Sequence, residues 1–260
     1  SASLRMDKKV KVNAVRFLPS QKYGNLIVTA GNDGIVLWNV GDTLYKVDSS
    51  KSEKTFVRVD VDPTGNWIAA VCRDKCVYLF TTQQNELTDS ISLKFVRPLP
   101  AGGYPCNSVS FSPKENLLAV GNTHGEILVY ENNGLDFVLK SPNPLQPTGT
   151  NKTEREGLVF DMAFNSEGNQ LAAAFKENLR IHIWDMENLK REPTTWTPDF
   201  GGPMCLQFAQ SGEQLYYGAN DGTLGCLFGA KREPGEGTCI TLEEIECDNS
   251  GFTSVAAAVD

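Results

Sequence analysis

Long apolar runs and a targeting signal are both missing from this chain. Its 260 residues contain no apolar run of roughly 18 residues or more, so we expect no membrane-spanning helix. The N-terminal sequence SASLRMDKKV has no apolar stretch behind its basic residues, which argues against a signal peptide. Both absences predict a protein that does not insert into a membrane.

An excess of basic residues is missing too. The chain has 24 Lys and Arg against 32 Asp and Glu, which gives a net charge of -8. Nucleic-acid-binding proteins usually present a basic face, so this balance argues against a nucleic-acid partner. The cluster Lys8, Lys9 and Lys11 is short, and such clusters are usually solvated.

Paired cysteine motifs are absent as well. The cysteines number seven, an odd count, and stand scattered among apolar residues: Cys72, Cys76, Cys106, Cys205, Cys226, Cys239 and Cys247. Cys72 and Cys76 are the closest pair, but they form no CxxC motif and no histidine accompanies them. We therefore expect free thiols, no metal site and an intracellular location, cytoplasmic or nuclear.

Catalytic signatures are equally scarce. No nucleophile elbow and no glycine-rich phosphate loop occurs, and the carboxylates fall mainly in expected turns and outer strands. The stretch IHIWD places His182 three residues before Asp185, which invites the hypothesis of a catalytic dyad. Strand alternation, however, turns the two side chains to opposite faces, so we predict a structural role for His182. We expect no catalytic residue and no cofactor.

What the chain does have is an internal repeat. Five segments each end in an aromatic residue, with separations of 42, 50, 54 and 44 residues: Trp38, Phe80, Tyr130, Trp184 and Phe228. Each begins with a short apolar strand, such as 12–17 or 106–111, followed by a polar turn such as DPTGN or NSEGN. Glycines in these turns, such as Gly65, can adopt the left-handed conformation that closes a hairpin.

Two further strands and a more polar fourth strand complete each segment. The fourth strand is expected at 90–96, 136–141 and 238–244 in three of them. The proline-rich stretches RPLPAGGYP and SPNPLQPTGTNKTEREG are interpreted as inserted connections. Four antiparallel strands repeated at this period predict an all-β protein, a β-propeller in one domain over 1–260. The expected blades are 12–49, 54–97, 104–141, 157–199 and 202–245.

On these motifs the chain resembles the WD-repeat (WD40) family, nearly continuously from residue 12 to 245. The resemblance rests on Trp184-Asp185 after IHI, on the Asp-Gly turns at Asp33 and Asp221, and on FSP in the third segment. The family often places a Gly-His dipeptide before the first strand, where the histidine bonds the turn aspartate. No segment has that histidine, so Asp33, Asp74 and Asp221 lack this partner and the repeats are degenerate.

The number of blades is low for the family. Residues 251–260, GFTSVAAAVD, are expected to form the first strand of a sixth blade, whereas closed rings of the family usually have roughly six to eight blades. We therefore expect an incomplete ring within this chain. The sequence is a fragment, residues are absent from it, or a partner supplies the remaining blades. A complete five-bladed ring is the less favoured alternative, because the strand at 251–260 would then have no role.

The resemblance implies a function in binding rather than in catalysis. The family binds peptides and protein domains with the face formed by the loops that enter each first strand and by the turns between second and third strands. Mapping the repeat onto this face gives these candidate partner-binding residues: Lys11, Asn13, Arg58, Arg73, Asn107, Phe160, Asp161, Lys176 and Met204. Phe160 and Met204 are either apolar anchors for a partner or fillers of the entry loops.

Three classes of function remain open. The first and favoured one is a non-catalytic protein–protein interaction scaffold, a subunit of a multiprotein complex. The second is a receptor for a peptide motif or a substrate, which would use the propeller face. The third and least favoured is a propeller hydrolase, because the expected first strands carry mostly Val, Ser, Ala and Phe rather than converging metal ligands.

Overall fold

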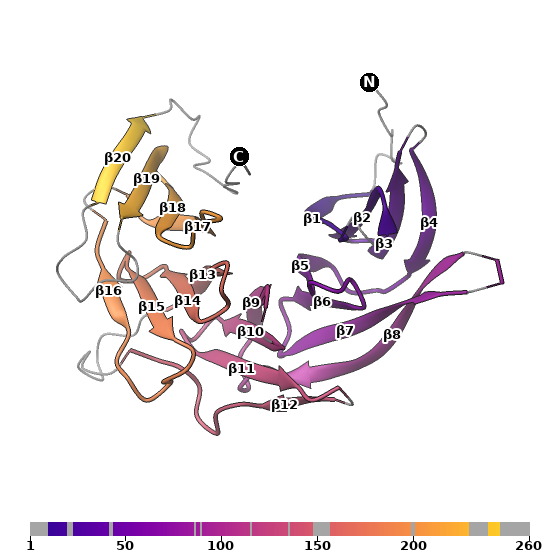
Figure 1. The fold of residues 1–260 in the computed structure, drawn as a ribbon, viewed down its shortest axis with the longest axis horizontal. Coiled ribbons are helices and arrows are strands. Elements are labelled where there is room, and N and C mark those ends of the chain that lie inside the picture. Colours follow the sequence, from indigo (N-terminus) through magenta and orange to yellow (C-terminus); the bar gives the residue numbers. More distant parts are fainter. Residues whose placement is uncertain are drawn as a thin grey trace. The chain divides into compact units, whose positions relative to one another are not determined.

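The structure is a computed structural model of the chain. It describes residues 10–19, 23–41, 44–85, 87–88, 90–114, 116–134, 136–147, 157–198, 201–228 and the backbone of 239–244. The strands form antiparallel sheets of four, which confirms the predicted all-β class (Figure 1). The described part of the chain holds no helix long and apolar enough to cross a membrane. The chain divides into two compact units, Ser1–Phe111 and Ser112–Asp260.

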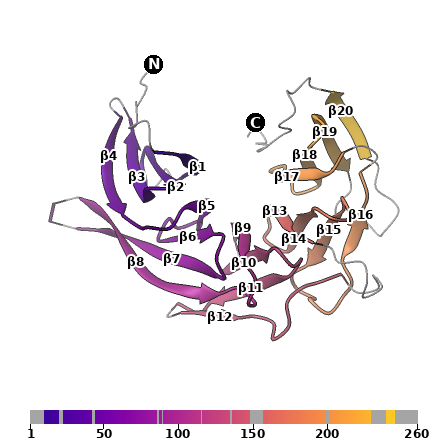
Figure 2. The ribbon, with the colours of Figure 1, turned by 180° about the vertical axis from the view of Figure 1, so that it is seen from behind.

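The first unit contains two complete sheets. The first sheet has the order β1 (Val12–Phe17), β2 (Leu26–Gly31), β3 (Gly34–Val40) and β4 (Leu44–Ser50). The second has the order β5 (Phe56–Val61), β6 (Trp67–Cys72), β7 (Cys76–Gln84) and β8 (Ile91–Pro100). Strand β9 (Cys106–Phe111) ends this unit. The long β7–β8 hairpin is visible in Figure 2.

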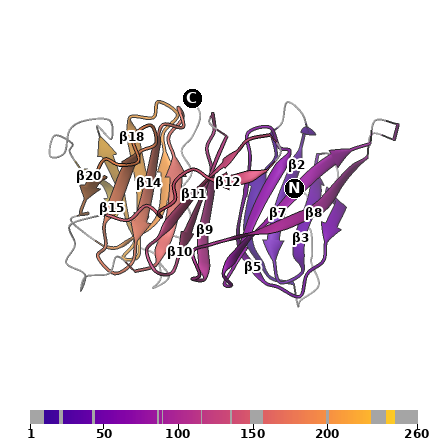
Figure 3. The ribbon, with the colours of Figure 1, turned by 90° about the horizontal axis from the view of Figure 1, so that it is seen from below.

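The second unit contains the remaining strands. β10 (Leu117–Asn122), β11 (Ile127–Asn132) and β12 (Phe137–Leu139) continue the sheet that β9 begins. The fourth sheet is β13 (Val159–Phe164), β14 (Gln170–Phe175), β15 (Ile181–Asp185) and β16 (Thr194–Trp196). The fifth is β17 (Pro203–Phe208), β18 (Gln214–Ala219), β19 (Thr223–Phe228) and β20 (Cys239–Glu244), and Figure 3 shows these sheets from below. The predicted strand at 251–260 lies outside the described residues.

Small apolar residues make the second strand of each sheet a core strand. All residues of Leu171–Phe175 are buried, as are all of Leu117–Asn122. A strand between two others has both backbone edges paired, so both of its faces can pack against apolar side chains. Trp184 on β15 is among the largest fully buried side chains and packs with Phe175 in one cluster of the second unit.

The turn DPTGN illustrates how local sequence closes each first hairpin. Gly65 has φ +69°, as predicted for a left-handed turn glycine. The carboxylate of Asp62 accepts hydrogen bonds from the Thr64 and Trp67 backbone N–H groups at 3.2 and 2.6 Å. Turn and carboxylate together fix the register with which β5 meets β6.

One expected connection is part of a strand. RPLP had been interpreted as part of an inserted loop, but β8 continues through Arg97 to Pro100, with Pro98 opposite Tyr78. Proline is tolerated here because β8 is the edge strand of its sheet, where an N–H pointing away from β7 is not needed. The interpretation as a loop was therefore wrong for these residues.

Candidate functional site

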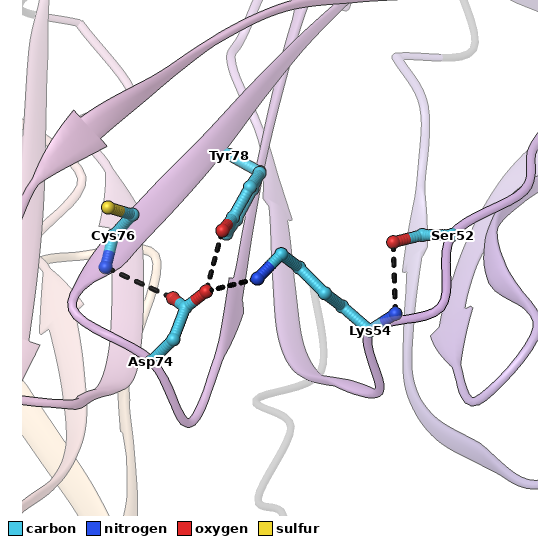
Figure 4. Close-up of polar contacts among 5 residues, drawn as sticks. All are labelled: Ser52, Lys54, Asp74, Cys76 and Tyr78. Atoms are coloured by element: carbon cyan, nitrogen blue, oxygen red, sulfur yellow. Dashed lines mark hydrogen bonds and ion pairs between the residues drawn. The ribbon is translucent and has the colours of Figure 1, made fainter.

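The turn between β6 and β7 carries a polar network centred on Asp74. The Asp74 carboxylate accepts hydrogen bonds from Lys54 Nζ at 2.7 Å, from the Tyr78 hydroxyl at 2.6 Å and from the Cys76 backbone N–H at 3.1 Å (Figure 4). Lys54 comes from the link between β4 and β5, where its own N–H donates to the Ser52 hydroxyl at 3.1 Å. One carboxylate thus joins this link to the β6–β7 turn.

The charges in this network are stable at neutral pH. The hydrogen bond to Asp74 holds the pKa of Lys54 above its usual range. Burial acts to raise the pKa of Asp74, but the hydrogen bonds from Lys54 and Tyr78 outweigh burial, and the pKa is lowered. Burial, followed by the hydrogen bond to Asp74, raises the pKa of Tyr78 to about 12. Lys54 and Asp74 therefore form a charged pair beside a protonated phenol.

Three thiols surround the same carboxylate. Burial and then Asp74 raise the pKa of Cys72 to about 11, and they raise the pKa of Cys76 and of Cys106 as well. A thiolate is the reactive form of cysteine, so none of the three is poised for nucleophilic or redox chemistry at neutral pH. The described residues contain no group of three or more His, Cys, Asp or Glu side chains arranged to hold a metal ion.

Lys54 stands in for the histidine that the repeat lacks. Asp74 was expected to be without the family's histidine partner, and Lys54, two residues before Phe56, reaches the carboxylate instead. The sequence did carry a signal for this ion pair, because Lys54 stands in front of a first strand, where the family has its histidine. The pair was not predicted because only a histidine was considered as the partner of the turn aspartate. Asp221 has a local role, since its Oδ1 accepts the Thr223 N–H at 3.0 Å.

Cations gather around this network along one end of the first unit. The five residues of this basic edge are Lys11, Lys51, Lys54, Arg73 and Lys75, and all are exposed. Arg73 and Lys75 flank Asp74 in the turn. The Lys11 N–H donates to Asn32 Oδ1 at 2.7 Å, in the turn between β2 and β3. Lys51 lies beside the same turn, because its Cα is 3.3 Å from the position that a Cβ on Gly34 would occupy.

The carboxylates at this edge are fewer than the cations. They are Asp33, Glu53 and Asp74, and Asp74 is occupied by Lys54. Five cations against three carboxylates form a local excess of positive charge in a chain with a net charge of -8. An acidic chain with one basic edge is suited to bind an anionic surface there, because like charges elsewhere repel that surface.

The remaining candidates in the first unit lie deeper than the basic edge. The Asn13 carboxamide donates to the Phe56 carbonyl at 2.7 Å, so it links β1 to β5. Arg58 is half-buried and its Nη1 donates to the Val57 carbonyl at 3.3 Å. Asn107 is also half-buried, on β9. Of the predicted site residues in this unit, only Lys11 and Arg73 are well exposed.

The candidates in the second unit fall into two groups. Asp161 accepts the Leu206 N–H at 3.0 Å and thereby links β13 to β17, and Phe160 packs against the apolar cluster between the fourth and fifth sheets. Met204 is half-buried on β17, whereas Lys176 is exposed. The packing of Phe160 favours the filler interpretation over the partner anchor.

His182 is a core residue. Only 1% of its surface is exposed, and its Nδ1 lies 2.9 Å from Thr195 Oγ1 on β16. Its ring meets Phe175 edge-on at 5.1 Å between centroids and lies 5.7 Å from Trp184. Asp185 instead accepts the N–H groups of Glu187 and Asn188 in the turn after the strand. The two residues do not form a dyad.

Comparisons with known families agree with this geometry. Residues 109–211 match the family described as the anaphase-promoting complex subunit 4 WD40 domain, and residues 46–81 match the WD domain, G-beta repeat. The chain belongs to the WD40-repeat family. No curated protein sequence matches this WD40 chain.

Solved structures share the fold of the WD40 chain at low identity. The β-propeller domain of Cps50 (Swd1) from Myceliophteria thermophila is 16% identical with a TM-score of 0.66, covering 90% of this chain and 73% of that chain. Sqt1 from Chaetomium thermophilum is 15% identical with a TM-score of 0.70, covering 95% and 64%. U3-55K is 11% identical with a TM-score of 0.64, covering 87% and 63%. The WD40 chain thus spans less than two thirds of the Sqt1 and U3-55K chains.

Proposed function

We propose that this WD40 chain is a non-catalytic protein-interaction scaffold, a subunit of a multiprotein complex, and that its basic edge binds an acidic segment of a partner protein. The observation that carries the proposal is the cluster of exposed cations around the Lys54–Asp74 pair in an otherwise acidic chain. One of the matching families is named for a subunit of a complex, the anaphase-promoting complex, which supports the same class of function.

The geometry supports a binding role for this edge in two ways. The Asp74 network holds the link between β4 and β5 against the β6–β7 turn, so the backbone beneath Lys54, Arg73 and Lys75 is ordered before a partner arrives. Arg73 and Lys75 remain exposed, and Arg in particular can bind a carboxylate with two parallel hydrogen bonds. Attraction of an acidic segment would increase its association rate and make it sensitive to salt.

The chemistry of the described residues speaks for binding over catalysis. The Tyr78 phenol and the surrounding thiols are held in their protonated forms, and His182 is buried against aromatic rings. Neither the Tyr78 phenol nor these thiols are therefore poised to act as a general base or a nucleophile near neutral pH. A cation-rich surface without an activated group is suited to hold a partner.

Charge reversal tests the proposal. The triple variant Lys51→Glu, Arg73→Glu and Lys75→Glu should lose the partner that the basic edge binds, measured by quantitative co-purification. The control variant Lys46→Glu, Lys94→Glu and Lys190→Glu changes the net charge equally at exposed positions elsewhere and should retain that partner. Undiminished co-purification of every partner with the first variant would refute the proposal. Binding of short acidic peptides by the chain alone would indicate a peptide-motif receptor instead.

A further inference from the structure

Arg58 on β5 is a half-buried arginine that has no ion pair within the described part of the chain. The hydrogen bond of its side chain there runs from Nη1 to the carbonyl of the preceding residue, Val57, at 3.3 Å. A guanidinium has five N–H donors in a planar fork, and a cation withdrawn from water is costly unless an anion compensates it. Most donors of Arg58 are therefore left for a ligand.

The other charged residues on the first strands of the five described sheets bond to a neighbouring strand. They are Arg16 on β1, Asp60 on β5 and Asp161 on β13. Arg16 Nε donates to Asp60 Oδ1 at 3.2 Å, and Asp161 accepts the N–H of Leu206 on β17 at 3.0 Å. Arg58 differs because its hydrogen bond stays within β5. The packing of one sheet on the next therefore gives no reason for a charge at this position.

Asp60, the next carboxylate along the strand, is already engaged on both oxygens. Arg58 and Asp60 are two residues apart and project from the same face of β5, whereas Val59 between them belongs to a core cluster. Asp60 Oδ1 accepts from Arg16 Nε at 3.2 Å, and Oδ2 accepts the Phe111 N–H at 2.7 Å. Two arginines thus accompany one carboxylate, which leaves one positive charge in excess at Arg58.

Arg58 lies close to the basic edge. The strand β5 begins at Phe56, two residues after Lys54, and Arg58 pairs with Val71 on β6, which stands two residues before Arg73. Two residues of a strand span about 7 Å, which is comparable to the length of an extended arginine side chain. A segment held by the basic edge can therefore place one of its own side chains against the Arg58 guanidinium.

We infer that Arg58 is a binding site for a single carboxylate, and that it takes the side chain of one Asp or Glu from the acidic segment proposed above. The guanidinium fork holds both carboxylate oxygens through two parallel N–H···O hydrogen bonds. This inference rests on the proposed function, because the basic edge brings the acidic segment to Arg58. It adds the residue that selects a carboxylate by geometry, whereas the exposed cations of the basic edge attract any anion.

A carboxylate suits this place better than a phosphate group does. One positive charge is in excess at Arg58, and a carboxylate brings one negative charge. A phosphate monoester carries about −1.5 to −2 at neutral pH, so part of its charge would stay uncompensated. The Asp60 carboxylate on the same face of β5 would repel that remaining charge.

Acetate and inorganic phosphate test the site in the chain alone. At constant ionic strength, the NMR signal of the Arg58 Nε–H, assigned through its loss in Arg58→Lys, should shift with sodium acetate and reach saturation. The Arg16 Nε–H is the internal control: its side chain is 47% exposed but already bonded to Asp60, so its signal should shift little. No saturable shift of Arg58 with acetate would overturn the inference, as would saturation by phosphate at a lower concentration than by acetate.

A fluorescent oligoglutamate peptide and quantitative co-purification of the partner test the assignment to the acidic segment. Arg58→Lys keeps the charge but loses the fork, so it should weaken binding of the peptide and of the partner roughly tenfold. The control Arg180→Lys alters another half-buried arginine, in the second unit, and should bind as the unmodified chain does. The unfolding midpoint of Arg58→Lys should stay unchanged, since this side chain bonds only within its own strand.

The outcomes separate this inference from the proposed function. If the charge-reversed basic edge loses the partner while Arg58→Lys retains it at full affinity, the proposed function stands and the inference is refuted. If the charge-reversed basic edge retains every partner while acetate still saturates Arg58, the proposed function is refuted and the carboxylate site itself is supported. A dimer of the unmodified chain that Arg58→Lys converts to monomers, measured by light scattering, would show that a second copy supplies the carboxylate and would overturn its assignment to a partner protein.

Discussion

The carboxylate of Asp60 on β5 accepts a hydrogen bond from the backbone N–H of Phe111 on β9, with 2.7 Å between Oδ2 and N. Its other oxygen accepts from Arg16 Nε on β1 at 3.2 Å. One side chain thus joins three first strands of the first unit. Its side chain is only 18% exposed, so both bonds form in surroundings largely shielded from water.

Asp60 should give the chain a measurable dependence of stability on pH. Burial raises the pKa of Asp60 above its ordinary 3.8, against the opposing effects of Arg16 and the Phe111 N–H. At a pH between the unfolded and the folded pKa, Asp60 therefore holds a proton in the folded chain that it has released in the unfolded chain. The contribution of Asp60 to stability is fully present below pH 3.8 and is lost as the pH rises through the folded pKa.

The variant Asp60→Asn keeps an acceptor for the Phe111 N–H and removes this titration. Urea unfolding between about pH 4 and pH 7 should give a flatter stability profile for the variant than for the unmodified chain. Glu53→Gln, which changes an exposed carboxylate, serves as the control and should leave the profile unchanged. An unaltered slope in Asp60→Asn would contradict the assignment.

The Lys54–Asp74 pair should contribute little stability despite its short distance. Their side chains are 45% and 32% exposed, so solvent screens the pair, and a double-mutant cycle with Lys54→Met and Asp74→Asn should give a coupling of no more than about 1 kcal/mol. The coupling should fall as salt is added. The more exposed Lys114–Glu167 pair is a matched comparison and should couple less. A larger coupling energy for Lys114–Glu167 would show that the Asp74 network does not strengthen the Lys54–Asp74 pair.

Replacing His182 should destabilise the fold without changing partner binding. His182→Ala removes a ring packed against Phe175 and Trp184 and the partner of Thr195, so we expect a loss of about 2–4 kcal/mol in the free energy of unfolding. Thr195→Val removes the hydrogen bond alone and should cost about 1 kcal/mol. Denaturant titrations measure both. A stable His182→Ala variant that loses its partners would indicate a functional histidine instead.

Replacing Gly65 and Gly24 distinguishes two destabilising effects at a turn glycine, backbone strain and a steric clash of the new Cβ. Both have positive φ, at +69° and +61°, but a Cβ on Gly65 would lie 2.5 Å from the Tyr23 ring, while nothing lies within 4 Å of a Cβ on Gly24. Gly24→Ala should therefore cost about 1–2 kcal/mol from backbone strain alone.

Gly65→Ala should cost more, because the Tyr23 ring cannot move aside easily. The Tyr23 hydroxyl lies 2.8 Å from Thr82 Oγ1, and Thr82 donates to the Gly65 carbonyl at 2.6 Å. We expect about 2–4 kcal/mol, measured by urea unfolding of both variants. Equal losses in the two glycine variants would show that the ring yields freely.

Much of the fold could be predicted because its signals are local. The first strands Val12–Phe17 and Cys106–Phe111 and the left-handed Gly65 follow from residues a few positions apart. Strand alternation also placed His182 and Trp184 on one face, and their rings lie 5.7 Å apart. Prediction was wrong for Pro98, since proline is tolerated in a strand only at a sheet edge, and the edge is defined by tertiary pairing.

The sequence by itself determined the repeat, the turns and the class of fold, because strand period and turn chemistry depend on neighbouring residues. Only the tertiary structure decided which polar side chains are partners. Lys54 reaches Asp74 across 20 residues, Asp161 reaches Leu206 across 45 and Asp60 reaches Phe111 across 51. It also decided which apolar side chains of the first strands are buried, since burial depends on which sheet packs in front of a strand rather than on the strand's own residues.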